Sequence, residues 1–188
     1  MAAPRSRVGL SLAGFTTVID AAGGRAALES KSTEWLKQSL VKPATAAASI
    51  PYAALLRALP NGAELVGNAT HFLSHAYSMP FLCSVDAAAA WAARNPRAGG
   101  APHFFYFDLL VVNQHGQTMG VTPEILWEEF AGGVRSVGYV FFVRVLASEL
   151  IPRVFLFNLT RFLAATRCSC SPTTTRCPSR APGASRRL

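Results

Sequence analysis

In the first third of the chain, residues 1–68, apolar segments are bounded by the residues that typically begin and end helices. The segment 12–22 stops at Gly23-Gly24, and glycine readily adopts the positive φ that often closes a helix. Ser32 can cap a second helix, and Pro51 suits the first turn of a third. We therefore expect residues 1–68 to form a helical N-terminal preface.

From residue 69 onward, short and densely apolar segments alternate with helical patterns. Three segments have the composition of buried strands: residues 70–75, 103–112 and 137–145. A helix after Pro80 separates the first two, and a helix that begins at Thr122-Pro123-Glu124 separates the last two. Strands that alternate with crossover helices form parallel sheets. The pattern predicts an α/β domain over residues 69–160 with a parallel sheet of the flavodoxin-like type. The last elements of such a sheet can be missing toward the C-terminus.

The segment 103–112 is apolar on both faces except at Asp108, as in a central strand covered by helices. A buried carboxylate without a partner is costly. Asp108 must therefore have a structural partner, such as a helix-end amide or an arginine, be neutral, or face the edge of the sheet.

Charge is distributed unevenly along the chain. The net charge is +8, but six of the 18 basic residues lie after residue 160, where there is no acidic residue. The preceding part has a balance of only +2, which is too small for a surface that holds a phosphate backbone, so we expect no nucleic-acid partner. Residues 161–188 are rich in Ser, Thr, Pro and Arg, and we expect a disordered basic tail.

Several other classes of protein are disfavoured by the sequence. The four cysteines are too few and too clustered for a disulfide scaffold, and no secretory signal stands out, so we expect a cytoplasmic protein. The apolar segment 139–165 contains several charged residues, which argues against a membrane span. His71 and His75 would lie ~13 Å apart on a strand, so we expect no metal site there. There is no phosphate-binding glycine motif, and we expect no cofactor.

Two segments resemble a known pattern. Residues 69–77, Ala-Thr-His-Phe-Leu-Ser-His-Ala-Tyr, resemble the first strand of TIR-like domains. Residues 104–115, which include Phe-Asp-Leu-Leu-Val-Val-Asn-Gln-His, resemble a strand of heterokaryon-incompatibility domains, which are relatives of the TIR fold. The resemblance covers roughly residues 14–145. It implies a signalling or protein-interaction module that acts by self-association or by docking to a protein partner.

The chain departs from this pattern near its end. In enzymatically active TIR domains a glutamate in a late helix supports the cleavage of NAD, and the helix commonly carries Trp-Cys. The corresponding residues 159–166 contain no Trp, Cys or acid, and Glu149 is the least unsuitable substitute. Two alternatives to the interaction module therefore stay open. The chain is a NAD nucleosidase, an enzyme that binds and cleaves NAD, or it is a truncated, non-functional fragment of such an enzyme.

Polar residues follow two of the expected strands. Ser74 and His75 end the first, and Asn113, Gln114 and His115 end the second. Ligands of open parallel sheets bind at the carboxyl ends of the strands, so these residues are ligand-binding candidates, together with Asp108. The amides and Ser74 could bind a ribose or a phosphate, and the histidines could exchange protons near neutral pH. Alternatively, the same groups satisfy loop backbone and helix ends. No residue is assigned as catalytic.

Overall fold

The computed structural model describes residues 7–115, 139–144 and 153–158. Three of the expectations above fall outside these residues: the helix at Thr122, the late helix at 159–166 and the disordered tail.

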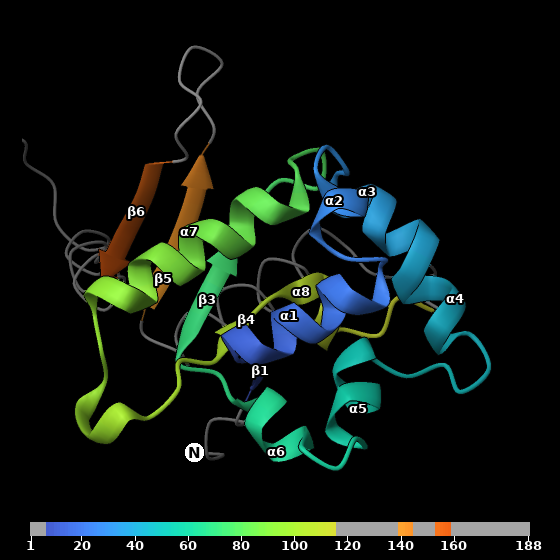
Figure 1. The fold of residues 1–188 in the computed structure, drawn as a ribbon, viewed down its shortest axis with the longest axis horizontal. Helices are drawn as coiled ribbons and strands as arrows, with labels where there is room; N and C mark the ends of the chain where they lie inside the picture. Colours follow the sequence, from blue (N-terminus) through green and yellow to red (C-terminus); the bar gives the residue numbers. More distant parts are fainter. Residues whose placement is uncertain (1–6, 116–138, 145–152, 159–188) are drawn as a thin grey trace, which may run out of the picture.

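One sheet of six strands organises the described residues, in the order β2-β1-β4-β3-β5-β6 (Figure 1). The strands are β1 (Val8–Leu10), β2 (Val66–Asn68), β3 (His71–Ser74), β4 (Phe105–Tyr106), β5 (Tyr139–Arg144) and β6 (Arg153–Asn158). The central strand β3 pairs in parallel with β4 on one side and with β5 on the other. The three segments expected as neighbouring parallel strands therefore do pair.

The rest of the sheet corrects the expected architecture. β1 pairs antiparallel with both β2 and β4, and β5 pairs antiparallel with β6. The sheet is therefore mixed, and the expectation of a parallel, flavodoxin-like sheet was wrong. The reason lies outside the three expected strands: the N-terminal segment contributes β1 and β2 in addition to its helices, and β6 returns along β5.

The helices of the N-terminal segment are short. They are α1 (Leu12–Ala21), α2 (Arg25–Leu28), α3 (Thr33–Leu36), α4 (Lys42–Thr45), α5 (Tyr52–Arg57) and α6 (Gly62–Leu65). The expected cap at Ser32 is present, because its hydroxyl accepts from the amide of Trp35, and Ser11 caps α1 in the same way by accepting from the amide of Gly14. A π-helix, η1 (Lys37–Val41), joins α3 to α4.

The π-helix accounts for a proline inside this helical segment. Pro43 lies at the start of α4, a position that directly follows another helical segment. Within an α-helix, a proline ring clashes with the carbonyl four residues earlier. In the wider turn of a π-helix the amide of Lys42 bonds instead to the carbonyl of Lys37, five residues back. The chain can therefore continue as a helix through Pro43.

The segment 103–112 is only partly a strand. β4 covers two residues, and Asp108 begins a one-turn helix, α8 (Asp108–Val111). Leu109 and Leu110 of that helix are fully buried. Burial on all sides produces the same continuous apolar run in a strand and in a buried helical turn, so the run alone could not separate the two.

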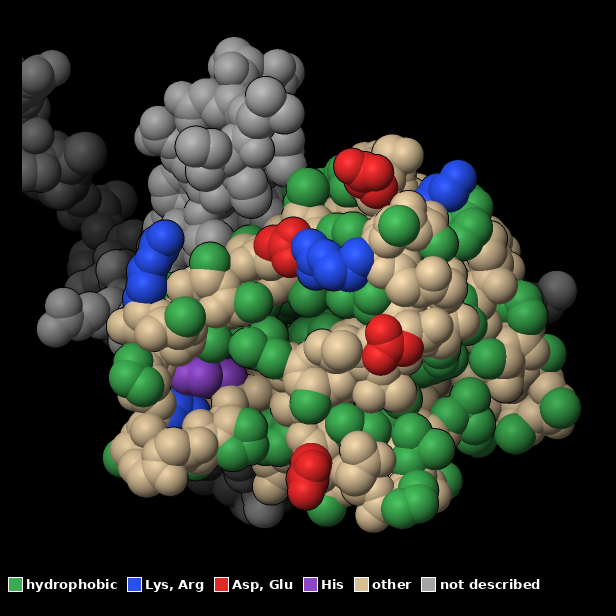
Figure 2. Space-filling model, viewed as in Figure 1, with side chains coloured by type: hydrophobic (Ala, Val, Ile, Leu, Met, Phe, Trp, Pro, Cys, Tyr) green, Lys and Arg blue, Asp and Glu red, His purple; other side chains and the backbone are tan. Residues whose placement is uncertain are grey.

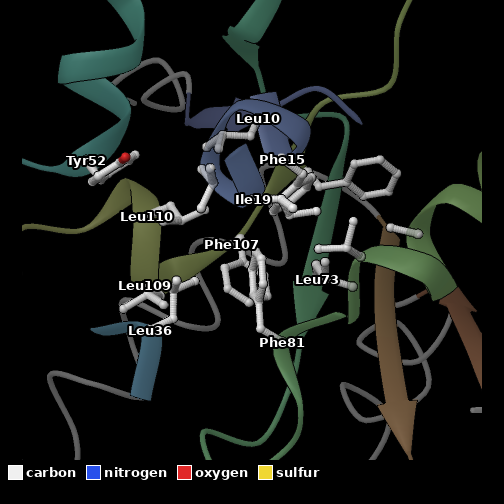
Figure 3. Packing of buried hydrophobic residues seen from close by; sticks show 14 of the residues in the cluster. Leu10, Phe15, Ile19, Leu36, Tyr52, Leu73, Phe81, Phe107, Leu109 and Leu110 are labelled. Atoms are coloured by element: carbon white, nitrogen blue, oxygen red, sulfur yellow. The ribbon is translucent and has the colours of Figure 1, made fainter. Parts of the chain in front are cut away.

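The main core lies between one face of the sheet and the helices α1 and α7 (Phe81–Arg94) (Figure 1). Phe15 of α1 packs against the rings of Phe81 and Phe107 (Figure 3) and against that of Phe105. Phe72 and Tyr106 stack on each other as a separate, smaller cluster. Because side chains alternate along a strand, Leu73 and His75 share the face of the main core, whereas Phe72 and Ser74 occupy the other.

Candidate functional site

The carboxyl ends of β3 and β4 bring His75 and Asp108 together. The Nδ1 atom of His75 lies 3.7 Å from Oδ1 of Asp108, which is an electrostatic contact longer than a hydrogen bond. The His75 side chain is only 2% exposed, whereas that of Asp108 is 42% exposed. The carboxylate is therefore open to solvent, and the imidazole behind it is enclosed.

Tyr77 completes this group and was not among the sequence candidates. Its hydroxyl donates to Oδ2 of Asp108 at 3.3 Å, and its ring stacks on His75 with centroids 5.3 Å apart. Burial and the neighbouring Asp108 carboxylate both raise the pKa of Tyr77, so the phenol stays protonated and remains a donor. The signal available in the sequence was its position, two residues after His75 at the exit of the strand.

His75 lies between two aromatic rings, those of Tyr77 and Phe107. The Phe107 ring is stacked on it with centroids 4.0 Å apart and planes inclined by 12°. Burial lowers the pKa of His75, and this effect outweighs the opposing influence of Asp108 and of a hydrogen bond with the backbone of Leu73. Its Nε2 atom is buried with no hydrogen-bond partner among the described residues. Neutral and enclosed, His75 is poorly placed to exchange protons with a substrate.

Asn113 and His115 connect the end of α8 to the helical segment 33–49. Asn113 donates from Nδ2 to the carbonyl of Ser49 at 2.6 Å and accepts from the amide of His115 at 2.9 Å. Nε2 of His115 lies 2.7 Å from Oγ1 of Thr45, whose hydroxyl donates to the carbonyl of Val41. Because that hydroxyl has given its proton to Val41, His115 must be the donor in the contact. We call this set of bonds the Asn113 latch.

Gln114 and Ser74 are placed apart from the latch and from each other. The amide of Gln114 donates to the carbonyl of Val112 at 3.0 Å and, at 3.4 Å, to that of Asp108, so it closes the end of α8. Ser74 is partly exposed on the face of β3 opposite His75 and is paired in register with Phe142 of β5. The six sequence candidates therefore form a His75–Asp108 pair, an internal latch and two separate residues, not one convergent site.

Within residues 7–115, 139–144 and 153–158, no group of three His, Cys, Asp or Glu side chains is arranged to hold a metal ion. None of the helices in this part of the chain combines the length and apolar character needed to cross a membrane.

Comparison with known proteins identifies no relative: no protein-family model, no curated protein and no solved structure matches this chain.

Proposed function

We propose that this chain is a protein-interaction module that acts by self-association, and that it is not an enzyme. The observation that carries the proposal is the use made of the polar residues at the strand ends. Asn113, Gln114 and His115 direct their hydrogen bonds into the chain, to backbone carbonyls and to Thr45. Asn113 and His115 hold the helical segment 33–49 against the end of α8, and Gln114 closes α8 itself, so residues expected to bind a ligand have structural roles.

The helical segment held in this way presents an aromatic surface. The Trp35 side chain of α3 is 36% exposed, and the ammonium group of Lys31 lies 5.3 Å from the centre of its ring. The ammonium group of Lys37 lies 5.1 Å from the ring of Tyr77 and 3.9 Å from a carboxylate oxygen of Glu34. We call these five residues the Trp35 patch.

The composition of the Trp35 patch suits a second copy of the chain as partner. Tryptophan and tyrosine provide much of the binding energy in protein interfaces. In a twofold dimer the same surface meets itself, so it must be complementary to itself. The patch carries lysines and a glutamate side by side, and Lys31 and Lys37 of one copy can pair with Glu34 of the other.

Sedimentation velocity of the full 188-residue chain tests this proposal over a range of concentrations. We expect reversible dimers, and we expect Trp35→Ala to raise the dimer dissociation constant by about 30-fold, since truncation of such a central aromatic residue costs at least ~2 kcal/mol. Leu59→Ala is the matched control, because Leu59 is similarly exposed but lies outside the patch. A chain that stays monomeric, or that responds equally to both substitutions, would contradict the proposal.

The relation to TIR-like domains is proposed on the two sequence motifs. The first motif provides β3 and its exit with His75 and Tyr77, and the second provides β4, α8 and the Asn113 latch. The antiparallel strands β1, β2 and β6 depart from a flavodoxin-like sheet, so the relation concerns this central part of the chain.

A further inference from the structure

A groove opens at the opposite end of β3 and β4 from the His75–Asp108 pair. It has a volume of about 540 Å³ and lies between the start of α1, the helix α6, the end of α7 and the loop 96–102. Figure 2 shows this hollow, with histidine and basic side chains beside each other at its wall; the lining residues of those types are His103 and Arg97. The volume is within the range of small-molecule sites in proteins.

Small side chains keep the groove open. Ala13, Ala63 and Ala92 line it from three different helices, so at these positions the walls carry only methyl groups. The loop on its far side turns through Gly99 and Gly100, which have φ values of 67° and 69°. Side chains other than glycine are strained in that conformation. The shape of the groove is therefore built into the backbone of this loop.

Arg97 is fixed at the wall of the groove. One guanidinium nitrogen, Nη1, donates to the carbonyl of Pro102 at 2.7 Å across the loop. Within the part of the chain that the structure describes, no carboxylate forms an ion pair with this guanidinium, so its charge is available to a ligand. Glu64 is the one acidic residue among those lining the groove, and it belongs to α6 rather than to the loop that carries Arg97.

His103 adds a second polar group to the same wall. It is 9% exposed, and its Nε2 atom lies 2.8 Å from the carbonyl of Asn95, so Nε2 is the donor in that bond. Its Nδ1 atom is buried with no hydrogen-bond partner among the described residues. Buried polar atoms are nearly always satisfied, and because Nε2 carries the proton, Nδ1 is an acceptor that a donor group of a ligand can satisfy.

The start of α1 also favours an anion in the groove. The ten-residue helix begins in the groove at Leu12 and Ala13 and has no acidic residue in its first turn. The amide groups of a first helical turn and the helix dipole favour an anion at that end.

We propose that this groove binds a small ligand with an apolar body and one anionic group, a carboxylate or a phosphate, and that Arg97 is the partner of the anion. The apolar body lies against the alanines, and Nδ1 of His103 can accept a hydrogen bond from a donor group of the ligand. The inference is independent of the self-association proposed above, because the groove and the Trp35 patch share no residue.

Isothermal titration of the full chain with benzoate, phenyl phosphate, inorganic phosphate and the neutral benzamide tests the inference. We expect benzoate or phenyl phosphate to bind more tightly than both inorganic phosphate and benzamide. Whichever of the two binds more tightly identifies the anion. Equal binding of benzamide would overturn the role of the charge, equal binding of inorganic phosphate would overturn the role of the apolar body, and no binding of any probe at millimolar concentration would overturn the site itself.

Arg97→Gln should weaken the binding of the anionic probe by about tenfold or more, as expected for the loss of a charge-assisted hydrogen bond. Arg94→Gln is the matched control, because Arg94 is an exposed arginine at the end of α7 that does not line the groove. The thermal unfolding of both variants shows whether they are folded. Equal affinities of the two folded variants would overturn the assignment of Arg97. Ala63→Phe tests the groove itself: it adds a large side chain from an exposed position and should abolish binding.

Discussion

Two histidines, His71 at the start of β3 and His75 just after its end, lie in aromatic surroundings on the core face of the sheet. The ring of His71 contacts Trp91 at 4.6 Å and His103 at 5.1 Å between centroids. Burial, followed by the neighbouring His103 and Arg97, lowers the pKa of His71 from 6.5 to about 4. Protonation of His71 therefore costs more in the folded chain than in the unfolded one.

This difference predicts a loss of stability in acid. An unfolded histidine takes up its proton near pH 6.5, so the folded state is fully favoured above that pH and loses stability as the pH falls toward 4. The shift corresponds to about 3 kcal/mol for His71. Urea unfolding measured at pH 7, 5.5 and 4 should show this decrease, and His71→Gln should reduce it. A variant with the same pH dependence as the wild type would contradict the assignment to His71.

Tyr77 is the residue that holds the exposed carboxylate in place. Tyr77→Phe removes the hydroxyl that donates to Asp108 and leaves the stacked ring. We expect a loss of about 0.5–1.5 kcal/mol in the free energy of unfolding, as for a typical hydrogen bond, because Asp108 is partly exposed and water can replace the donor. Denaturant unfolding at pH 7 measures it. A loss well above 3 kcal/mol would show that the ring itself, and not the hydroxyl, had been displaced.

At the scale of elements, α1 is placed by the absence of a side chain at Gly14. A Cβ atom at this position would lie 2.6 Å from the carbonyl oxygen of Leu65 at the end of α6. Glycine inside a helix is unfavourable by up to ~1 kcal/mol relative to alanine, so an isolated helix would gain from Gly14→Ala. In this chain the contact is with backbone, which cannot turn aside as a side chain can.

We therefore expect Gly14→Ala to destabilise the protein by about 1–3 kcal/mol, the usual cost of overpacking, despite its better helix propensity. Thermal or urea unfolding checks this, with Thr16→Ala at an exposed position of the same helix as control. The control should change the free energy of unfolding by less than about 0.5 kcal/mol. An increase in stability for Gly14→Ala would mean that α1 and α6 are less closely packed than described.

The elements also show what could be predicted from the sequence. The cap at Ser32 and the two parallel pairings of β3 followed from local signals, because a cap residue and long apolar runs are recognised from neighbouring residues. The strands β1 and β2 could not be predicted, since three residues are too few to show a period of two. The two strands pair with each other, and Leu10 of β1 pairs with Phe105 of β4, which is distant in the sequence. These pairings place both strands in the sheet.

The candidate site divides in the same way. His75 was expected at a strand exit, but Asp108 was expected inside the strand 103–112, and it lies beside His75 because β4 ends at Tyr106 and α8 begins at Asp108. The hydrogen-bond partners of Asn113 and His115 are Ser49 and Thr45, which lie more than 60 residues earlier. No local sequence pattern indicates such partners. The groove at Arg97 depends on how three helices and a loop meet. The sequence therefore indicated which polar residues follow the strands, and their partners depend on contacts between distant segments.

At the scale of the whole molecule, the arrangement bears on the rival function, cleavage of NAD. In glycosidic bond cleavage a carboxylate stabilises the sugar as the bond breaks, and a positioned acid or base adds ~10²–10⁴-fold in rate. Asp108 is the partly exposed carboxylate at the described strand ends, but it already accepts from the amide of Leu109 and the hydroxyl of Tyr77. Both bonds favour a fixed, structural carboxylate.

We therefore expect no release of nicotinamide when the purified 188-residue chain is incubated with NAD, because Asp108 is engaged and His75, the nearest base, is enclosed and neutral. Chromatography of the reaction at pH 7 detects nicotinamide directly. Asp108→Asn and Glu149→Gln are the informative variants, since each removes one carboxylate with little change of shape. Release by the wild-type chain that disappeared in either variant would identify that carboxylate as part of an active site, and the interaction module proposed above would have to give way to an enzyme.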